Sequence, residues 1–214
     1  MRRTIVLLAT MTLTLLVASG VALAVTKIGT NGPDTLRATN GADNLLGNGA
    51  NDVLFAPGGT DNLLGGKDWT LGGNERRPQG GDKTLVGGAG DDGVQGGLGS
   101  DTLPGGSSGN DFVFGDKGSD RLVGGEGRDS IDGARGSDRM LGQGGGDLFF
   151  DGPFEESSKD SVLSGGGGDI IVADHVPAAK DVVSCGDGFD RGLAYSKDVV
   201  GPDCERVRIV HGTE

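Results

Sequence analysis

The chain has 214 residues, of which 45 are glycine, and its 31 acidic and 19 basic side chains give a formal net charge of −12. Only 34% of the residues are hydrophobic and 4% are aromatic, which excludes an ordinary globular domain with a thick apolar core. The acidity argues against nucleic acid and anionic membrane surfaces as partners, and it favours cations. Seven prolines without a three-residue glycine period exclude a collagen helix.

The first 24 residues have the features of a secretory signal peptide. Arg2 and Arg3 precede an apolar run over 5–17, and Ala24 ends a small-residue motif of the kind that signal peptidases cleave. A retained membrane anchor is the alternative, but the apolar run is short for a bilayer span. Cleavage would leave a chain that begins at Val25 with 17 basic and 31 acidic side chains, hence a charge of −14. We therefore expect a secreted, extracellular protein without a membrane span.

An aspartate recurs every nine residues behind this segment, and an apolar residue follows it two places later. The best copies, such as 96–104 and 124–132, read G-G-x-G-x-D-x-U-x, where U is apolar. The period covers 29–172, with an interruption at 65–86 that keeps Asp82 as a fragment of the pattern and an insertion over 151–159. The aspartates in the sixth place are Asp34, Asp43, Asp52, Asp61, Asp92, Asp101, Asp111, Asp120, Asp129, Asp138, Asp147, Asp160 and Asp169.

The residue types of the repeat predict a turn followed by a short strand. Glycines in three of the first four places permit positive φ and close backbone approach, while the last three places suit a strand with one inward side chain. Two repeats then complete a coil of 18 residues, and stacked coils form two parallel sheets. The predicted fold over 25–172 is all-β, a parallel β-roll (β-solenoid) of about eight coils and roughly 40 Å in length.

A core with one sizeable side chain per repeat cannot offset a backbone ordering cost of roughly 1–2 kcal/mol per residue. Stacked carboxylates also repel one another unless a hard cation with oxygen ligands lies between them. Ca²⁺ suits such flexible oxygen shells better than Mg²⁺, and two cysteines and two histidines cannot supply zinc clusters. For any single aspartate, a residue that caps its own turn is the alternative interpretation. The common register of the set instead predicts several bound Ca²⁺ ions.

The nonapeptide resembles the hemolysin-type calcium-binding repeat of RTX proteins. This resemblance implies that the thirteen sixth-place carboxylates bind calcium, that loop carbonyls complete the shell, and that the ions lie between turns of successive coils. We expect weak or absent calcium binding over 65–86. The same holds for the first four repeats, whose second place departs from glycine at Thr30, Thr39, Asn48 and Pro57.

Residues 173–214 keep the aspartate rhythm with fewer glycines, which predicts a terminal coil and a cap over the apolar end. Cys185 and Cys204 would meet oxidising conditions after export, and a disulfide closing a loop of about 20 residues contributes on the order of 3 kcal/mol. Free thiols or an intermolecular bond are the alternatives, because the two cysteines occupy different places in the repeat. The segment resembles the Cys-Gly…Cys-Glu tail of some secreted repeat proteins.

Nothing in the pattern indicates catalysis. The residues at 88–93 match the sequence motif of a dinucleotide-binding loop, and those at 105–109 match the motif of a nucleophile elbow. Both segments lie in repeat turns without the α/β pattern that surrounds a functional motif of either kind. We therefore predict a non-catalytic, calcium-dependent structural or interaction module. The alternative is an accessory calcium-binding subunit or fragment of a secreted enzyme or toxin whose catalytic part is on another chain.

Overall fold

A computed structural model describes residues 23–47, 52–56, 60–65, 82–152, 158–173, 180–195 and 197–210. The secondary structure of these ranges consists of strands, and they contain no helix with the length and apolarity needed to cross a bilayer. Several predicted features lie outside the described residues: the signal peptide up to residue 22, Asn48, Pro57, most of the interruption at 65–86, and the middle of the insertion at 151–159.

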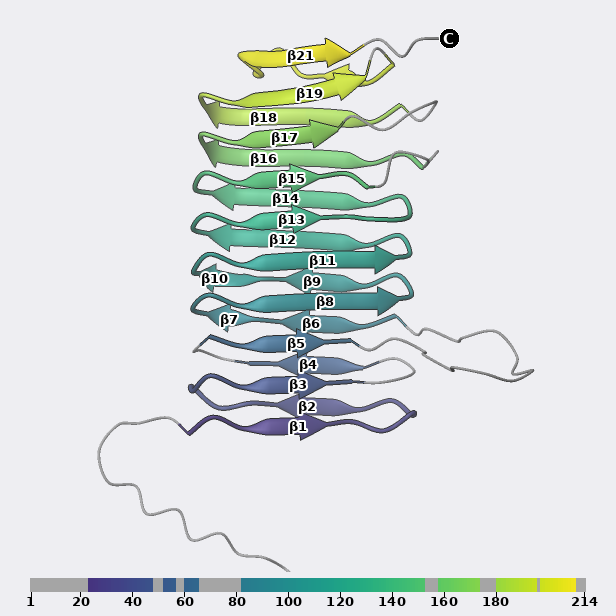
Figure 1. Ribbon diagram of the computed structural model, residues 1–214, viewed down its shortest axis with the longest axis vertical. Coiled ribbons are helices and arrows are strands. Elements are labelled where there is room, and N and C mark those ends of the chain that lie inside the picture. Colours follow the sequence, from purple (N-terminus) through teal and green to yellow (C-terminus); the bar gives the residue numbers. More distant parts are fainter. Residues whose placement is uncertain are drawn as a thin grey trace, which may run out of the picture.

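The strands form two long parallel sheets that face each other along one elongated stack (Figure 1). The first sheet consists of β1 (Thr26–Ile28), β3 (Asn44–Leu46), β5 (Asn62–Leu64), β8 (Gly93–Leu98), β11 (Phe112–Lys117), β13 (Ser130–Asp132), β15 (Leu148–Phe150), β17 (Ile170–Ala173), β19 (Arg191–Tyr195) and β21 (Arg206–Val210). The second consists of β2 (Thr35–Arg37), β4 (Val53–Phe55), β6 (Thr84–Val86), β9 (Thr102–Pro104), β12 (Arg121–Glu126), β14 (Arg139–Gly144), β16 (Ser161–Gly167), β18 (Val182–Gly188) and β20 (Val199–Val200). Two short strands, β7 (Gly88–Ala89) and β10 (Gly106–Ser108), pair beside them.

The register follows the repeat, because each strand pairs with the strand one full coil later. Val113 pairs with Val94 on one side and with Ile131 on the other, so the apolar place of every repeat stacks on itself. The predicted parallel β-roll is thereby confirmed. The stacking also continues past residue 172, because β18 to β21 extend both sheets with the same alternation.

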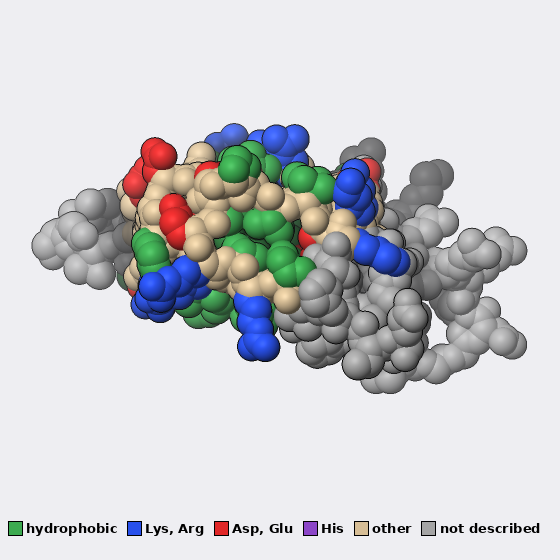
Figure 2. All heavy atoms as spheres, turned by 90° about the horizontal axis from the view of Figure 1, so that it is seen from above, with side chains coloured by type: hydrophobic (Ala, Val, Ile, Leu, Met, Phe, Trp, Pro, Cys, Tyr) green, Lys and Arg blue, Asp and Glu red, His purple; other side chains and the backbone are tan. Residues whose placement is uncertain are grey.

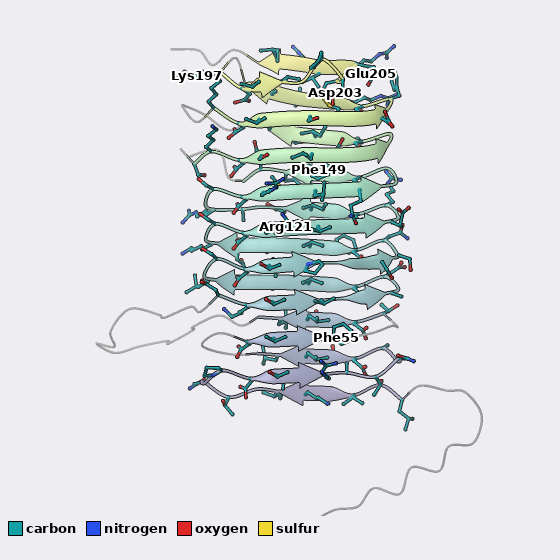
Figure 3. The ribbon with its side chains drawn as sticks, turned by 180° about the vertical axis from the view of Figure 1, so that it is seen from behind. Phe55, Arg121, Phe149, Lys197, Asp203 and Glu205 are labelled. Carbon is teal, nitrogen blue, oxygen red and sulfur yellow. A yellow bond between two sulfur atoms is a disulfide. The ribbon has the colours of Figure 1, made fainter. Side chains whose placement is uncertain are left out.

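The core is the thin apolar stripe between the sheets that the repeat predicts. Phe149 points into it from β15, and it is fully buried (Figure 3). From β3 to β18 the inward apolar side chains of the described repeats are at most 2% exposed: Leu45, Leu54, Leu63, Leu85, Val94, Leu103, Val113, Leu122, Ile131, Met140, Phe149, Val162, Ile171 and Val183. Each coil thus buries two such side chains, which is a small apolar area for 18 residues.

Glycine is required in the turns because successive coils approach each other closely. Gly109 and Gly127, in the fourth place of their repeats, have φ values of 125° and 136°. A methyl group on Gly127 would lie 1.7 Å from the carbonyl oxygen of Gly109, a distance that no side chain tolerates. The glycines that stack on one another in successive turns therefore allow the close spacing of the coils and bring the turn carbonyls near one another.

The two ends of the stack differ. At the N-terminal end Lys27 occupies the inward place opposite Leu45, and its ammonium donates to the carbonyl of Arg37. At the C-terminal end hydrophobic side chains lie in the middle of the exposed face, with lysine and arginine side chains near its rim (Figure 2). Cys185 and Cys204 are joined by a disulfide, with 5.1 Å between their Cα atoms.

Candidate metal sites in the turns

The turns between the two sheets arrange the sixth-place aspartates in two columns. Turns on one side of the stack end at Asp43, Asp61, Asp92, Asp111, Asp129, Asp147 and Asp169. Turns on the other side end at Asp34, Asp52, Asp101, Asp120, Asp138 and Asp160. All thirteen predicted residues therefore lie in the columns, and the structure adds Asp181 and Asp190, which the repeat pattern alone did not assign as sites.

Each column is a ladder of hydrogen bonds from backbone to carboxylate. The N–H of Asp92 donates to Oδ1 of Asp111 at 2.8 Å, and the N–H of Asp101 donates to Oδ1 of Asp120 at 2.7 Å. The same bond recurs from coil to coil. Through Oδ1 an aspartate thus caps the backbone of the preceding coil, which is why it must recur at a fixed register.

The second carboxylate oxygen, Oδ2, is buried and has no hydrogen-bond partner at many places in the columns. Leaving such an oxygen unsatisfied costs free energy, and an ionised carboxylate costs more than a neutral group. A repeated series of such atoms calls for a ligand that the protein itself does not supply. The residues with this buried Oδ2 are Asp52, Asp61, Asp92, Asp101, Asp111, Asp120, Asp129, Asp147, Asp160, Asp169 and Asp190.

A small space lined by oxygen adjoins these atoms. A methyl group placed on Gly96 would lie 2.5 Å from Oδ2 of Asp101 and 2.9 Å from the carbonyl oxygen of Gly115, one coil further. A methyl group on Gly105 would lie 2.6 Å from Oδ2 of Asp111 and 2.9 Å from the carbonyl of Gly124. The first-place glycine therefore keeps open a space where a carboxylate of one coil and a carbonyl of the next converge.

The donor set fits calcium. Among the described residues no three or more histidine, cysteine, aspartate or glutamate side chains gather as a metal cluster. Each turn instead provides one carboxylate, and backbone carbonyl oxygens are the nearest other groups that could bind a metal ion. A shell of single carboxylates and carbonyls suits Ca²⁺, which accepts six to eight oxygens in flexible geometry.

Without a bound metal ion, ionisation of the buried carboxyl groups in the columns costs free energy. At Asp92, Asp111 and Asp120 burial is the main cause that raises the pKa, neighbouring carboxylates of the column raise it further, and the backbone hydrogen bond opposes the shift. The pKa is raised to about 6 at Asp92 and Asp101, to about 7 at Asp111 and Asp147, and to about 8 at Asp120 and Asp160. A bound cation would favour the ionised form at each of them.

In the first two turns, threonine groups of the protein itself donate hydrogen bonds to the Oδ2 atom of the aspartate. Oδ2 of Asp43 accepts hydrogen bonds from the backbone N–H of Thr39 at 2.7 Å and from its hydroxyl at 2.9 Å. Oδ2 of Asp34 accepts from the hydroxyl of Thr30 at 3.0 Å and from its N–H. The second-place threonines thus occupy the oxygen that the later turns leave open, which supports weak calcium binding in these turns.

The interruption at 65–86 also departs from the pattern in a way that the sequence interpretation missed. Asp82, taken there as a fragment of the repeat, is exposed and accepts the N–H of Ser100 at 2.8 Å. The sixth place in the column belongs instead to Lys83, whose N–H donates to Oδ1 of Asp101 at 2.8 Å. The assignment of Asp82 to the pattern was wrong, because nine residues before Asp92 the register falls on Lys83, with Leu85 in the apolar place.

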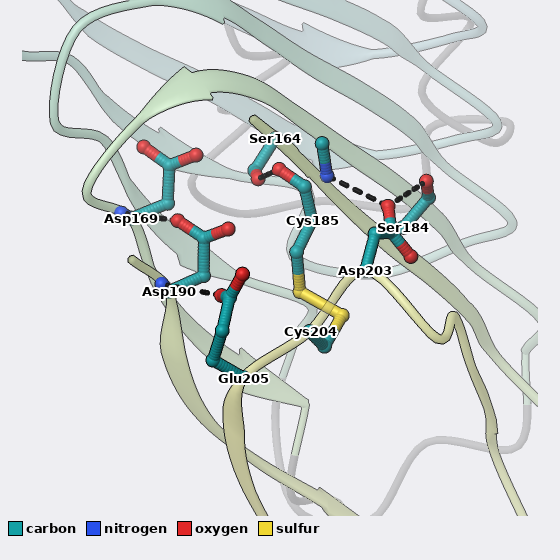
Figure 4. The surroundings of a disulfide bond; sticks show 9 residues. Ser164, Asp169, Ser184, Cys185, Asp190, Asp203, Cys204 and Glu205 are labelled. Atoms are coloured by element: carbon teal, nitrogen blue, oxygen red, sulfur yellow. Dashed lines mark hydrogen bonds between the residues drawn. A yellow bond between two sulfur atoms is a disulfide. The ribbon is translucent and has the colours of Figure 1, made fainter. Parts of the chain in front are cut away.

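The last coils replace turn glycines and close the columns with side chains (Figure 4). Ser164 and Cys185 stand where earlier repeats have the first glycine, and the Ser164 hydroxyl donates to the Cys185 carbonyl. Oδ2 of Asp203 accepts the hydroxyl of Ser184 at 2.8 Å and a backbone N–H at 2.7 Å. Glu205 ends one column by accepting the N–H of Asp190 at 3.1 Å.

The fold and the turns together define a parallel β-roll with a series of oxygen-lined sites suited to calcium. The family model of the RTX calcium-binding nonapeptide repeat matches the chain in four copies, at 28–63, 80–103, 105–140 and 114–149. The chain therefore belongs to the RTX-type calcium-binding repeat proteins. A comparison with curated proteins finds no match.

Proposed function

We propose that this protein is a secreted, non-catalytic β-roll whose folding is coupled to extracellular Ca²⁺ and which acts as a structural or interaction module. The observation that carries the proposal is the series of buried Oδ2 atoms without hydrogen-bond partners along the two columns. Ions at these atoms would neutralise the repulsion within each column and join one coil to the next. Metal binding would then supply folding free energy that the thin core does not.

The ions are assigned to the turns that combine a first-place glycine with an open Oδ2. On this basis the strongest sites use Asp92, Asp101, Asp111, Asp120, Asp129 and Asp147, and Asp52 meets the same criterion through Gly47. Asp138 occupies the same place in the ladder. Asp34 and Asp43 are assigned a structural role, because threonine donors occupy their Oδ2 atoms.

Secretion rests on the signal peptide assigned to residues 1–24. The first strand begins at Thr26, so cleavage after Ala24 would leave the β-roll intact. The backbone nitrogen of Val25 already donates to Oδ1 of Asp43, and the new amino terminus would place an ammonium group on the same carboxylate. Calcium in the range typical of extracellular modules, about 10⁻⁴–10⁻³ M, would then support folding after export.

Circular dichroism of the chain from Val25 to Glu214 tests the coupling directly. The protein is freed of metal with EGTA and titrated in parallel with CaCl₂ and MgCl₂, and we expect a transition to β-structure with Ca²⁺ alone. A spectrum that is already β in EGTA and does not respond to Ca²⁺ would show that the aspartates only cap the coils. Export is tested separately, by determining the N-terminal residue of the protein recovered from the medium, which we expect to be Val25.

A further inference from the structure

One place in the aspartate columns is occupied by a lysine. Lys83 takes the position between Asp52 and Asp101: Thr84 N–H donates to the Asp52 carbonyl at 2.9 Å, and Thr102 N–H donates to the Lys83 carbonyl at 2.8 Å. Lys83 N–H in turn donates to Oδ1 of Asp101, as aspartates do elsewhere in the ladder. The backbone of Lys83 therefore performs the same task as that of a sixth-place aspartate.

The side chain of Lys83 enters the space that the aspartates use. A methyl group on Gly65 would lie 2.6 Å from Cδ of Lys83, just as one on Gly47 would lie 2.5 Å from Oδ2 of Asp52. Lys83 is only 2% exposed, and a lysine is almost never so deeply buried unless its charge is paired. Its side chain thus crosses the oxygen-lined space beside a first-place glycine.

The ammonium group of Lys83 contacts the turn of the next coil. Its Nζ donates to the carbonyl oxygen of Leu98 at 2.9 Å, in the turn that leads to Asp101. The Asp101 carboxylate lies beside Lys83, because its Oδ1 accepts the Lys83 N–H at 2.8 Å. A carbonyl and a carboxylate of the adjacent turn therefore face a cation that belongs to the chain.

We propose that Lys83 is a built-in cation that takes the place of one calcium ion, so that the junction between its coil and the coil of β9 is held without metal. An aspartate with one Ca²⁺ and a lysine carry the same net positive charge, and both offer the facing carbonyl an electrostatic partner. This inference rests on the proposed function and determines where the series of ions is interrupted. Calcium would act at the open carboxylates before and after Lys83, while the junction at Lys83 would not respond to it.

Restoring an aspartate at this place tests the proposal. Native mass spectrometry counts the Ca²⁺ ions bound to the wild-type chain from Val25 to Glu214, to Lys83→Asp and to Lys117→Asp. Lys117 is an exposed lysine in a later turn on the same side, so its replacement matches the change in charge. We expect Lys83→Asp to bind one more ion than the wild-type chain and Lys117→Asp to bind the same number.

Calcium titrations followed by circular dichroism give a second readout. We expect Lys83→Asp to need a higher calcium concentration for folding than the wild-type chain and to reach the same β-signal at saturation. Lys83→Met, which removes the charge without adding a ligand, should bind no additional ion and should stay less stable at every calcium concentration. An unchanged ion count in Lys83→Asp, or failure of that variant to fold in saturating Ca²⁺, overturns the proposal. A wild-type chain that binds no Ca²⁺ would instead overturn the proposed function.

Discussion

The backbone N–H of Asp111 donates to Oδ1 of Asp129, one coil further along the stack, at 2.8 Å. Oδ2 of the same Asp129 carboxylate is buried and has no hydrogen-bond partner. One side chain thus supplies a structural bond with one oxygen and an open ligand position with the other. The two roles can be separated by mutation.

Replacing Asp129 by asparagine should remove the ligand and keep the structural bond, because the amide oxygen can still accept the N–H of Asp111. We expect Asp129→Asn to bind at least one Ca²⁺ fewer than the wild-type chain and to fold at a higher calcium concentration. Asp43→Asn is the matched control, since Thr39 occupies Oδ2 of Asp43, and it should leave the ion count unchanged. Native mass spectrometry distinguishes them, and an equal loss of ions in both variants would contradict the assignment.

The metal-free fold should gain stability on acidification. Burial raises the pKa of Asp111 and Asp147 to about 7 and of Asp120 and Asp160 to about 8, from an ordinary value of 3.8. Between the ordinary pKa and the raised values, these carboxyl groups bind more protons in the folded chain than in the unfolded chain. Their contribution to the stability of the fold is therefore greatest below about pH 4 and is lost as the pH rises to about 8.

Circular dichroism in metal-free buffer provides the measurement for this pH dependence. Lowering the pH from about 8 to about 5 should increase the β-signal without calcium. A loss of β-structure over the same pH range would show that the buried carboxylates are not the groups that limit folding.

Reduction of the disulfide should loosen the C-terminal coils. Cys185 and Cys204 are 19 residues apart in sequence, and a closed loop of this size contributes about 3 kcal/mol. We expect Cys204→Ser, or the wild-type chain in dithiothreitol, to lose hydrogen-exchange protection in β18 and β20 while β11 to β14 stay protected. Unchanged exchange in β18 would indicate that the cap is held by its hydrogen bonds alone.

A glutamine stands in a column of glycines and should be a site of strain. Gln143 has a φ of 82° and pairs with Gly125 and Gly165 in the neighbouring coils, whose φ values are 135° and 109°. Gln143→Gly should therefore raise the stability of the calcium-bound protein by about 0.5–1 kcal/mol, since glycine adopts this conformation without strain. Thermal unfolding in saturating Ca²⁺ measures it. Gly125→Ala should lower the stability, because the added methyl group would lie 2.3 Å from the Gly106 carbonyl.

Much of the fold follows from the repeat alone. With one inward residue in every nine, two repeats per coil place Val94, Val113 and Ile131 directly above one another, so the sheets, their parallel direction and the thin core all follow from the period. The same arithmetic places the sixth-place aspartates in columns. Local sequence suffices here because each coil contacts only its neighbours and each neighbour has the same pattern.

The tertiary structure decided which of these aspartates have an open oxygen and what replaces the ion elsewhere. Thr39 takes the Oδ2 of Asp43 through a turn geometry that the repeat pattern does not specify, and Lys83 enters its column only after an irregular segment of unequal length. The pairing of Cys185 with Cys204 likewise depends on how the last coil folds back. The disulfide partner is set by which coil stacks on which, whereas the contact of Thr39 with Asp43 depends on the geometry of a single turn.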